Sequence, residues 1–315
     1  MNYEYRVLVT APPILPKIYN YKDLFDKKSV EIVVPPYEVV ECLYENELKE
    51  LLKDIDGILC GDDKITENVL KQAKRLKVIS KWGTGIDTID KNAAEKLDIE
   101  VLRVKDVFSE PVSDTVLAYI LLFSRKIIEK NHLVRNNKWE KTESYALNEK
   151  SLGVIGLGHI GKVVSKKAIS LGMNVYGTDI KKISEDFITN TDIKMVSLSE
   201  LLINSDFITL HCDLNDTSFH LIGRDELKLM KPDSVLINTS RGEVIDQSVL
   251  ERSLQKNEIS GAALDVFEIE PLPSNSKFRQ LENVYLSPHN SNASPKVFNK
   301  VDDLSIKNLF LGLDL

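Results

Sequence analysis

The sequence predicts an α/β protein in which parallel sheets carry helices on their faces. Three observations support this fold class. Short apolar runs alternate with helical patterns over residues 1–103, a glycine-rich turn follows a strand near residue 156, and the alternation resumes after residue 179. A chain of 315 residues is expected to form about two domains.

In the first part of the chain, apolar runs bounded by turn residues predict strands over residues 5–10, 30–34, 57–60, 77–80 and 99–103. Helical spacing predicts helices over residues 45–53, 66–75 and 90–97. The longer pattern over residues 111–131 is apolar on more than one stripe, so we expect one helix that packs on two sides.

The second part predicts a sheet of about six or seven strands, the size of a dinucleotide-binding sheet. Its strands are expected at residues 152–156, 173–177, near 195, 207–211, 234–238, 259–264 and 284–287, with helices over 162–171, 199–204, 224–230 and 247–256. A last helix over residues 294–311 has no sheet of its own in this part of the sequence.

The glycine-rich turn over residues 156–161 predicts a dinucleotide site in a Rossmann-like, doubly wound sheet. Gly156 permits a tight turn, Gly158 lets backbone approach a pyrophosphate, and Gly161 lets helix and strand pack closely. Asp179 ends the next strand, where its carboxylate accepts hydrogen bonds from a ribose diol and repels a 2′-phosphate. Lys181 and Lys182 stand close enough in sequence to oppose that preference. The alternative is a plain strand–turn–helix connection.

Three polar side chains follow strands whose carboxyl ends converge on the cofactor crevice of such a sheet. Arg241, Glu270 and His289 would suit oxidation of an alcohol next to a carboxylate. The guanidinium would clamp the carboxylate, and the imidazole would take the hydroxyl proton. A carboxylate beside the imidazole is expected to raise its pKa. The alternatives are a surface or ion-paired arginine, a turn-capping histidine and a solvated glutamate.

Two further loops complete the candidate site. Gly83 and Gly85 follow a strand and expose backbone N–H groups that could hold a carboxylate, although a simple glycine turn is the other interpretation. His211 fits a packed strand-end residue better than a second base. Cys212 is not expected to act as a nucleophile, because nothing local lowers the pKa of its thiol.

Composition excludes several classes of function. The formal net charge is −7 and no Lys/Arg stripe is present, so nucleic acid is an unexpected partner. The longest apolar run, residues 116–123, is too short to span a bilayer, and the first residues lack a signal-peptide pattern. The three cysteines lack metal-type spacing, so we expect no metal and free thiols in the cytoplasm.

The chain resembles the D-isomer-specific 2-hydroxyacid dehydrogenase family, which includes phosphoglycerate, glycerate and D-lactate dehydrogenases. The matching motifs are KWGTGIDTID at 81–90, GLGHIG at 156–161, NTSRG at 238–242, ALDVFEIEP at 263–271 and SPHNSNAS at 287–294. The resemblance implies that Arg241 binds the substrate carboxylate, His289 is the acid/base and Glu270 is its partner. It implies substrate contacts from Gly83 and Gly85. It implies NAD contacts from Thr84, Gly156, Gly158, His159, Ile160, Gly161, Asp179, Cys212, Thr239 and Asp265.

The resemblance also implies an NAD-binding domain inserted in a split catalytic domain. The expected boundaries are 1–102 and 290–315 for the catalytic domain and 103–289 for the NAD domain, so the last helix would return to the first domain. Members of the family are commonly homodimers through the long helix that residues 111–131 resemble.

The implied function is hydride transfer between NAD and a small (D-)2-hydroxy or 2-oxo acid. Two other functions on the same scaffold stay open: an NAD(H)-sensing binding protein that acts like a co-repressor, and a phosphite-type dehydrogenase. Phosphoglycerate members often carry arginine in the loop after the third strand, whereas this loop reads Gly61-Asp62-Asp63. Two acids would repel a phosphate, so we predict an unphosphorylated substrate.

Overall fold

A computed structural model describes residues 3–315, so the first two residues of the predicted segment 1–102 lie outside the described part. The chain divides into two compact units. Unit 1 runs to Val107 and includes Ser294–Leu315, whereas unit 2 is Phe108–Ala293. Each unit contains one sheet in which every pairing is parallel, which confirms the predicted fold class.

The sheet of unit 1 has five strands in the order β2-β1-β3-β4-β5. All four residues of β3 and of β4 are buried, as expected for central parallel strands covered on both faces. The strands are β1 (Tyr5–Val9), β2 (Val30–Val33), β3 (Gly57–Cys60), β4 (Val78–Lys81) and β5 (Glu100–Arg103).

The helices of unit 1 depart from the sequence prediction in two places. The helix expected over 66–75 stops early, because the chain turns after Leu70 and buries Ala73 and Leu76 in the core. A 3₁₀ helix and a short helix over residues 15–27 were not predicted from the sequence. The helices are η1 (Leu15–Tyr21), α1 (Lys22–Lys27), α2 (Glu45–Leu51), α3 (Glu67–Leu70), α4 (Lys91–Lys96) and α12 (Pro295–Leu311).

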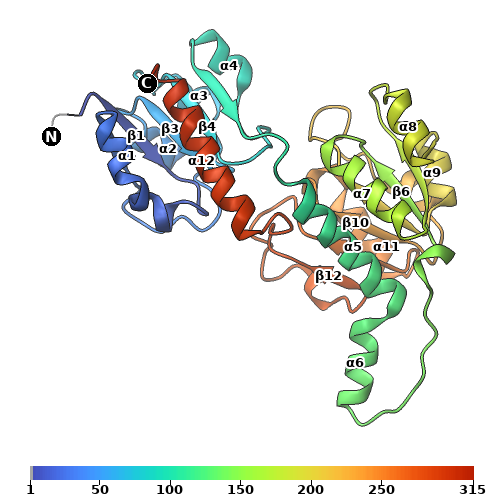
Figure 1. Ribbon diagram of the computed structural model, residues 1–315. Helices are drawn as coiled ribbons and strands as arrows, with labels where there is room; N and C mark the ends of the chain where they lie inside the picture. Colours follow the sequence, from blue (N-terminus) through green and yellow to red (C-terminus); the bar gives the residue numbers. More distant parts are fainter. Residues whose placement is uncertain (1–2) are drawn as a thin grey trace. The chain divides into compact units, whose positions relative to one another are not determined.

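Helix α12 packs on the sheet of unit 1, although it comes from the far end of the chain (Figure 1). Side chains of β4 and of the residue that follows it hold the helix in place. The Ser80 hydroxyl donates to the Ser305 carbonyl at 2.7 Å, and the Trp82 indole Nε1 donates to the buried Asp302 carboxylate at 2.7 Å. The terminal helix therefore packs on the sheet formed by the first part of the sequence.

The sheet of unit 2 has seven strands in the order β12-β11-β10-β9-β6-β7-β8. The strand order reverses between β6 and β9, and the crevice at such a switch point is where open α/β sheets bind ligands. The strands are β6 (Ser151–Ile155), β7 (Asn174–Thr178), β8 (Lys194–Met195), β9 (Phe207–Leu210), β10 (Val235–Asn238), β11 (Gly261–Leu264) and β12 (Val284–Leu286).

The long helix predicted over 111–131 is two helices, which corrects the expectation. The backbone of Lys126 is left-handed, with φ +49°, and this residue separates α5 (Ser109–Arg125) from α6 (Ile127–Arg135). Helix α5 packs on α7, whereas α6 has no buried residue and extends away from the sheet of its unit (Figure 1). The other helices are η2 (Leu147–Glu149), α7 (His159–Ser170), α8 (Glu185–Thr191), α9 (Leu198–Asn204), α10 (Arg224–Leu229), η3 (Gly242–Val244), α11 (Gln247–Gln255) and η4 (Lys277–Gln280).

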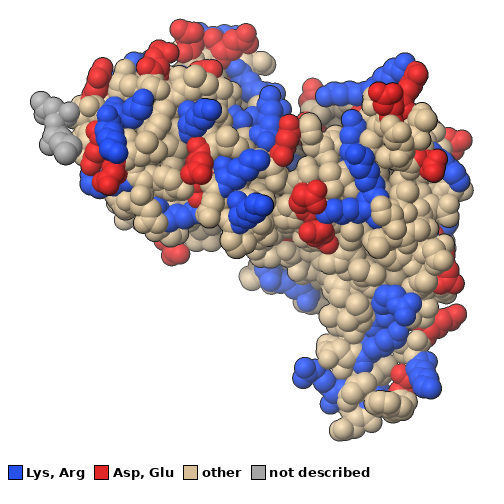
Figure 2. Space-filling model, viewed as in Figure 1, with Lys and Arg blue, Asp and Glu red and all other residues tan. Residues whose placement is uncertain are grey.

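The surface charge and the length and polarity of the helices bear on the predictions about membranes and nucleic acid. Within the described residues, every helix is too short or too polar to cross a membrane. On the face shown in Figure 2, basic and acidic side chains are interspersed, and no continuous basic stripe crosses it.

Candidate active site

The turn between β6 and α7 has the backbone geometry that a phosphate site requires. Gly156 has φ +88°, and a Cβ there would lie 2.7 Å from the Cys212 backbone nitrogen. A Cβ on Gly161 would lie 2.0 Å from the Gly156 carbonyl oxygen. Gly158 differs, because a Cβ there would meet no described atom within 4 Å. The structure therefore packs two of these glycines tightly and leaves open space at the third.

Helix α7 begins directly at this open space. His159 is its first residue, and Gly158, as the N-cap, offers no side-chain hydrogen bond to the first turn. The first N–H groups of a helix that lack a cap are available to an anion, and the helix dipole favours negative charge there. His159 is exposed and Ile160 is half-buried at this end of the helix. The turn can hold a pyrophosphate.

Asp179 follows β7 directly and faces this same turn. One carboxylate oxygen accepts a hydrogen bond from the Leu157 backbone nitrogen at 2.6 Å, and the other accepts one from the Lys181 backbone nitrogen at 2.8 Å. Each carboxylate oxygen can accept a second hydrogen bond, so a ribose diol can still bind. The contact with Leu157 fixes the acid beside the phosphate turn.

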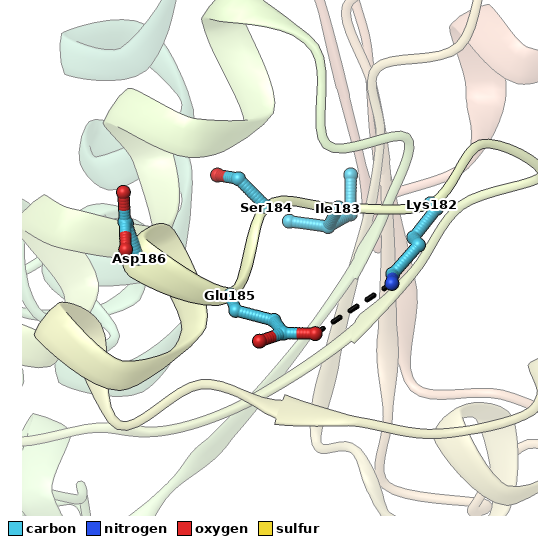
Figure 3. A pocket seen from close by; sticks show the side chains of 5 residues that line it. All are labelled: Lys182, Ile183, Ser184, Glu185 and Asp186. Carbon is cyan, nitrogen blue, oxygen red and sulfur yellow. Dashed lines mark ion pairs between the residues drawn. The ribbon is translucent and has the colours of Figure 1, made fainter.

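The segment after Asp179 bears on the choice between NAD and NADP. Lys182 lines a surface pocket formed by residues 182–186, and its Nζ lies 3.6 Å from a carboxylate oxygen of Glu185 (Figure 3). Both side chains are more than four-fifths exposed, so this ion pair is weak and cofactor choice depends mainly on Asp179.

The end of β9 brings His211 and Cys212 next to the glycine turn, since both contribute backbone atoms to the contact with Gly156. Burial lowers the pKa of His211 to about 3, and its Nε2 lies 3.0 Å from the Thr209 hydroxyl. Burial raises the pKa of Cys212 to about 11. A neutral imidazole and a protonated thiol are poor candidates for proton transfer or nucleophilic attack at neutral pH.

The end of β10 carries Arg241 on a turn that Asn238 organises. The buried Asn238 side chain donates to the Arg241 carbonyl at 2.8 Å and accepts from the Ser240 backbone and hydroxyl at 3.0 and 2.8 Å. Between them, Thr239 is buried, and its hydroxyl has no hydrogen-bond partner within residues 3–315. A buried hydroxyl without a partner is costly, so water or a bound molecule can satisfy it here.

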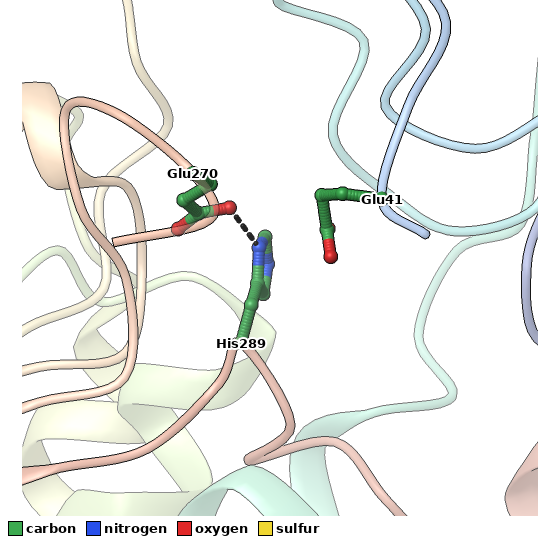
Figure 4. Close-up of side chains that lie close together, drawn as sticks. All are labelled: Glu41, Glu270 and His289. Atoms are coloured by element: carbon green, nitrogen blue, oxygen red, sulfur yellow. Dashed lines mark hydrogen bonds and ion pairs between the residues drawn. The ribbon is translucent and has the colours of Figure 1, made fainter. Parts of the chain in front are cut away.

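His289 and Glu270 form a pair at the carboxyl end of the same sheet (Figure 4). The imidazole Nδ1 lies 2.8 Å from one carboxylate oxygen of Glu270. The other oxygen accepts a hydrogen bond from the Phe267 backbone nitrogen at 2.8 Å. With Nδ1 engaged by Glu270, Nε2 is the ring nitrogen that would transfer a proton. This is the geometry of an oriented acid/base.

Asp265 holds the backbone around His289, a role that the sequence reasoning missed. Its carboxylate is fully buried and accepts hydrogen bonds from the backbone nitrogens of Asn290 and Ser291, both at 2.9 Å. Its carbonyl accepts a third from the His289 backbone nitrogen at 2.7 Å. His289 itself has φ +49°, a conformation that residues other than glycine adopt at a cost. Asp265 thus stabilises an otherwise strained turn.

In unit 1, the loop after β4 carries Gly83, Thr84 and Gly85. Gly83 has φ +132°, which favours glycine, and its carbonyl accepts from the Val104 backbone nitrogen at 3.0 Å. The Thr84 carbonyl accepts from the Arg103 guanidinium at 2.8 Å, and its hydroxyl donates to the Val104 carbonyl at 3.0 Å. The end of β5 therefore fixes this loop.

The two acids of the loop after β3 have partners, which changes the argument about phosphate. The Lys81 ammonium lies 2.9 Å from Asp62. Asp63 is fully buried, and its carboxylate accepts hydrogen bonds from Thr10, Leu43 and Gly61. Burial raises the pKa of Asp63. The negative charge that the sequence suggested here is largely offset.

These features fit a dinucleotide and define the class of this protein. The open space at Gly158, the uncapped start of α7 and the unsatisfied Thr239 hydroxyl lie at the carboxyl ends of β6 and β10, in one sheet. The same sheet edge carries the His289–Glu270 pair. The fold and the site are those of a dinucleotide-dependent oxidoreductase.

Comparison with known proteins identifies the family. Residues 117–291 match the family model described as D-isomer specific 2-hydroxyacid dehydrogenase, NAD binding domain. The chain belongs to this family, which confirms the resemblance found in the sequence. Its members are NAD-dependent 2-hydroxyacid dehydrogenases.

Similar proteins carry different substrate names. The chain is 36% identical to the glyoxylate reductase of Thermococcus litoralis, over 83% of this chain and 82% of that protein. It is also 36% identical to the D-3-phosphoglycerate dehydrogenase of Methanocaldococcus jannaschii, over 80% of this chain but 48% of that protein. The structure of the D-lactate dehydrogenase of Aquifex aeolicus, complexed with NAD and lactic acid, superposes with a TM-score of 0.84 at 27% identity, covering 96% and 93% of the two chains.

Proposed function

We propose that this protein transfers a hydride between NAD and small, unphosphorylated D-2-hydroxy acids or their 2-oxo acid counterparts. The observation that carries the proposal is the contact of 2.8 Å between His289 and Glu270, in the unit that also holds the phosphate turn. Family membership supports NAD as the cofactor. Relatives named glyoxylate reductase and hydroxypyruvate reductase support a small 2-oxo acid as the substrate.

When bound, NAD supplies the hydride acceptor or, reduced, the hydride donor. The Arg241 guanidinium binds the substrate carboxylate through parallel hydrogen bonds. Backbone N–H groups of Gly83 and Gly85 serve the same carboxylate. In reduction, protonated His289 donates its Nε2 proton to the carbonyl oxygen, and in oxidation the neutral ring takes the hydroxyl proton. Glu270 orients the ring and stabilises its charged form.

The cofactor residues take defined places in this proposal. Gly156, Gly158 and Gly161, with His159 and Ile160, receive the pyrophosphate at the start of α7. Asp179 receives the adenosine ribose. The remaining contacts come from Thr84, Cys212, Thr239 and Asp265.

An absorbance assay of NADH oxidation across 2-oxo acids tests the function. Glyoxylate, pyruvate and hydroxypyruvate should be reduced, with 3-phosphohydroxypyruvate reduced more slowly. Reversal of that order would contradict the predicted substrate class. NAD reduction with phosphite alone would instead identify a phosphite dehydrogenase, and tight NADH binding with no turnover of any acid would identify an NAD(H) sensor.

We also propose a cytoplasmic homodimer. The three cysteines, Cys42, Cys60 and Cys212, are free, which is typical of a reducing compartment. Helix α6 and the segment after it expose apolar side chains that a second copy would cover: Ile127, Ile128, Val134 and Trp139.

A further inference from the structure

Lys81 is an almost completely buried lysine at the carboxyl end of β4. Its side chain is 3% exposed, although lysine is rarely buried without compensation. In β4, alternate side chains point to opposite faces, and Ser80 and Trp82 face α12. Lys81 therefore lies on the other face of the sheet. A charge placed there needs partners.

Asp62 accounts for one of the three N–H donors of the Lys81 ammonium. Within residues 3–315, the Lys81 ammonium has a single hydrogen-bond partner, the Asp62 carboxylate at 2.9 Å. An ammonium has three N–H groups and no acceptor. Two donors of a buried cation are therefore left for a molecule that the protein binds, since leaving them unsatisfied is costly.

The side chain of Lys81 runs beside the glycine loop. A Cβ built on Gly83 would lie 3.8 Å from the Lys81 Cε, so the lysine stem occupies the flank of this residue. The loop is fixed from its other end by Arg103 and Val104. A buried ammonium with two N–H groups left over, beside a glycine loop, favours an anion.

We propose that Lys81 binds the carboxylate of the 2-oxo acid substrate, together with the Gly83–Gly85 loop. This inference rests on the proposed function and adds a cation to the substrate contacts proposed for the Gly83–Gly85 loop. Asp62 offsets the charge of the ammonium when no substrate is bound. A role as a purely structural ion pair is the competing account.

The experiment compares Lys81→Met, Asp62→Asn and a control, Lys49→Met, which removes a lysine paired with Glu45 on α2. Steady-state reduction of glyoxylate, pyruvate and hydroxypyruvate gives KM, and titration with oxamate in the presence of NADH gives substrate-site affinity without turnover. We expect Lys81→Met to raise KM and weaken oxamate by about 10- to 100-fold, the range for a hydrogen bond to a charged group. NADH affinity should be unchanged.

The Asp62→Asn variant distinguishes substrate binding by Lys81 from a purely structural ion pair. If Lys81 binds substrate, removal of the opposing carboxylate should leave KM unchanged or lower it, and Lys49→Met should behave as wild type. An equal rise of KM in Asp62→Asn and Lys81→Met would show a structural pair and overturn the inference. Unchanged oxamate affinity in Lys81→Met would overturn it as well.

The outcome also distinguishes failure of the inference from failure of the function. A wild-type protein that reduces 2-oxo acids while Lys81→Met does so equally well contradicts only the role of Lys81. A wild-type protein that neither reduces these acids nor binds oxamate contradicts the proposed function and this role with it. A KM increase confined to acids with a C3 hydroxyl would place the ammonium on that substituent and overturn the carboxylate assignment.

Discussion

Glu270 uses its two carboxylate oxygens for different tasks. One accepts a hydrogen bond from the Phe267 backbone, which fixes the loop, and the other contacts the imidazole of His289. Because the loop is fixed, the carboxylate can orient the ring before any substrate arrives. The charge of Glu270 should therefore matter mainly through the protonation of His289.

Glu270→Gln keeps the shape of this side chain and removes its charge. We expect the rate of 2-oxo acid reduction to fall off at a lower pH than in the wild type, because a carboxylate beside an imidazole favours its protonated form. At low pH the variant should lose less activity. Profiles of kcat/KM against pH would show this shift, and His289→Ala should lower kcat by about 10²- to 10⁴-fold at any pH. Superimposable profiles would exclude Glu270 as the group that tunes His289.

Asp179 should make the enzyme prefer NADH over NADPH by about 10- to 100-fold in kcat/KM, since its charge opposes a 2′-phosphate. Asp179→Asn should narrow this preference. Lys182→Met tests a contribution from this exposed lysine, and we expect it to leave NADPH use unchanged. A wild-type protein that uses NADPH as well as NADH would refute this assignment.

At the scale of elements, the glycine turn before α7 separates folding from binding. A Cβ on Gly161 collides with the Gly156 carbonyl, whereas a Cβ on Gly158 meets no described atom within 4 Å. Gly161→Ala should lower the thermal stability of the protein. Gly158→Ala should fold as the wild type does yet weaken NADH by at least about tenfold, which corresponds to about 1.4 kcal/mol. Thermal unfolding and NADH fluorescence would measure the two effects, and wild-type NADH affinity in Gly158→Ala would contradict a pyrophosphate at this position.

The start of β6 predicts an effect of pH on stability. The Asp206 carboxylate accepts hydrogen bonds from the Ser151 backbone and hydroxyl, both at 2.7 Å, and from Lys231 at 3.0 Å. Burial opposes the charge of Asp206, but the contacts with Ser151 and Lys231 outweigh it and hold the pKa of Asp206 below its usual range. A lowered pKa gives stability that is present above the unfolded value and is lost as the pH falls.

Asp206→Asn should therefore reduce the free energy of unfolding at pH 7, and the difference from wild type should shrink in acid, below about pH 4. Denaturant unfolding at several pH values measures this difference. Asp233→Asn is the control, because this carboxylate is exposed and 3.8 Å from Lys150. A deficit that stays constant down to pH 2 would mean that the charge of Asp206 does not stabilise the fold.

The sequence predicted the strands better than the helix ends, for a physical reason. Central parallel strands are buried on both faces, so their sequences are short apolar runs, as in β3 and β9. No glycine or proline marks the helix break at Lys126, and lysine rarely adopts a left-handed backbone. Tertiary contacts decide such a position.

The candidate site was predictable where a residue acts through its own motif. His289, Glu270 and the glycine turn belong to that class. The role of Asp265 and the proposed role of Lys81 were not predictable, because each depends on contacts with residues that are distant in the sequence. Asp265 binds backbone 25 and 26 residues away, and the partner of Lys81 lies 19 residues before it. A lysine at a strand end also suggests exposure, whereas here it is buried.

For the whole molecule, the proposed homodimer gives the clearest prediction. Two charges introduced on α6, Ile128→Glu and Val134→Glu, should convert a dimer into a monomer, because both side chains are exposed apolar groups on a helix with no buried residue. Sedimentation or light scattering gives the mass in solution. Leu171→Glu, at an exposed apolar position after α7, should leave the dimer intact. A wild-type protein of monomer mass would reject the proposal.

The return of α12 to the first sheet orders the events of synthesis. Ser80 and its partner Ser305 are 225 residues apart, so one face of β4 emerges from the ribosome long before the helix that covers it. Unit 2, by contrast, is one continuous stretch of chain and has every strand of its sheet by the time α12 is made. The first sheet to be synthesised is therefore the last to be fully covered by helices. Its apolar face is exposed to chaperones and to aggregation while the second unit is translated.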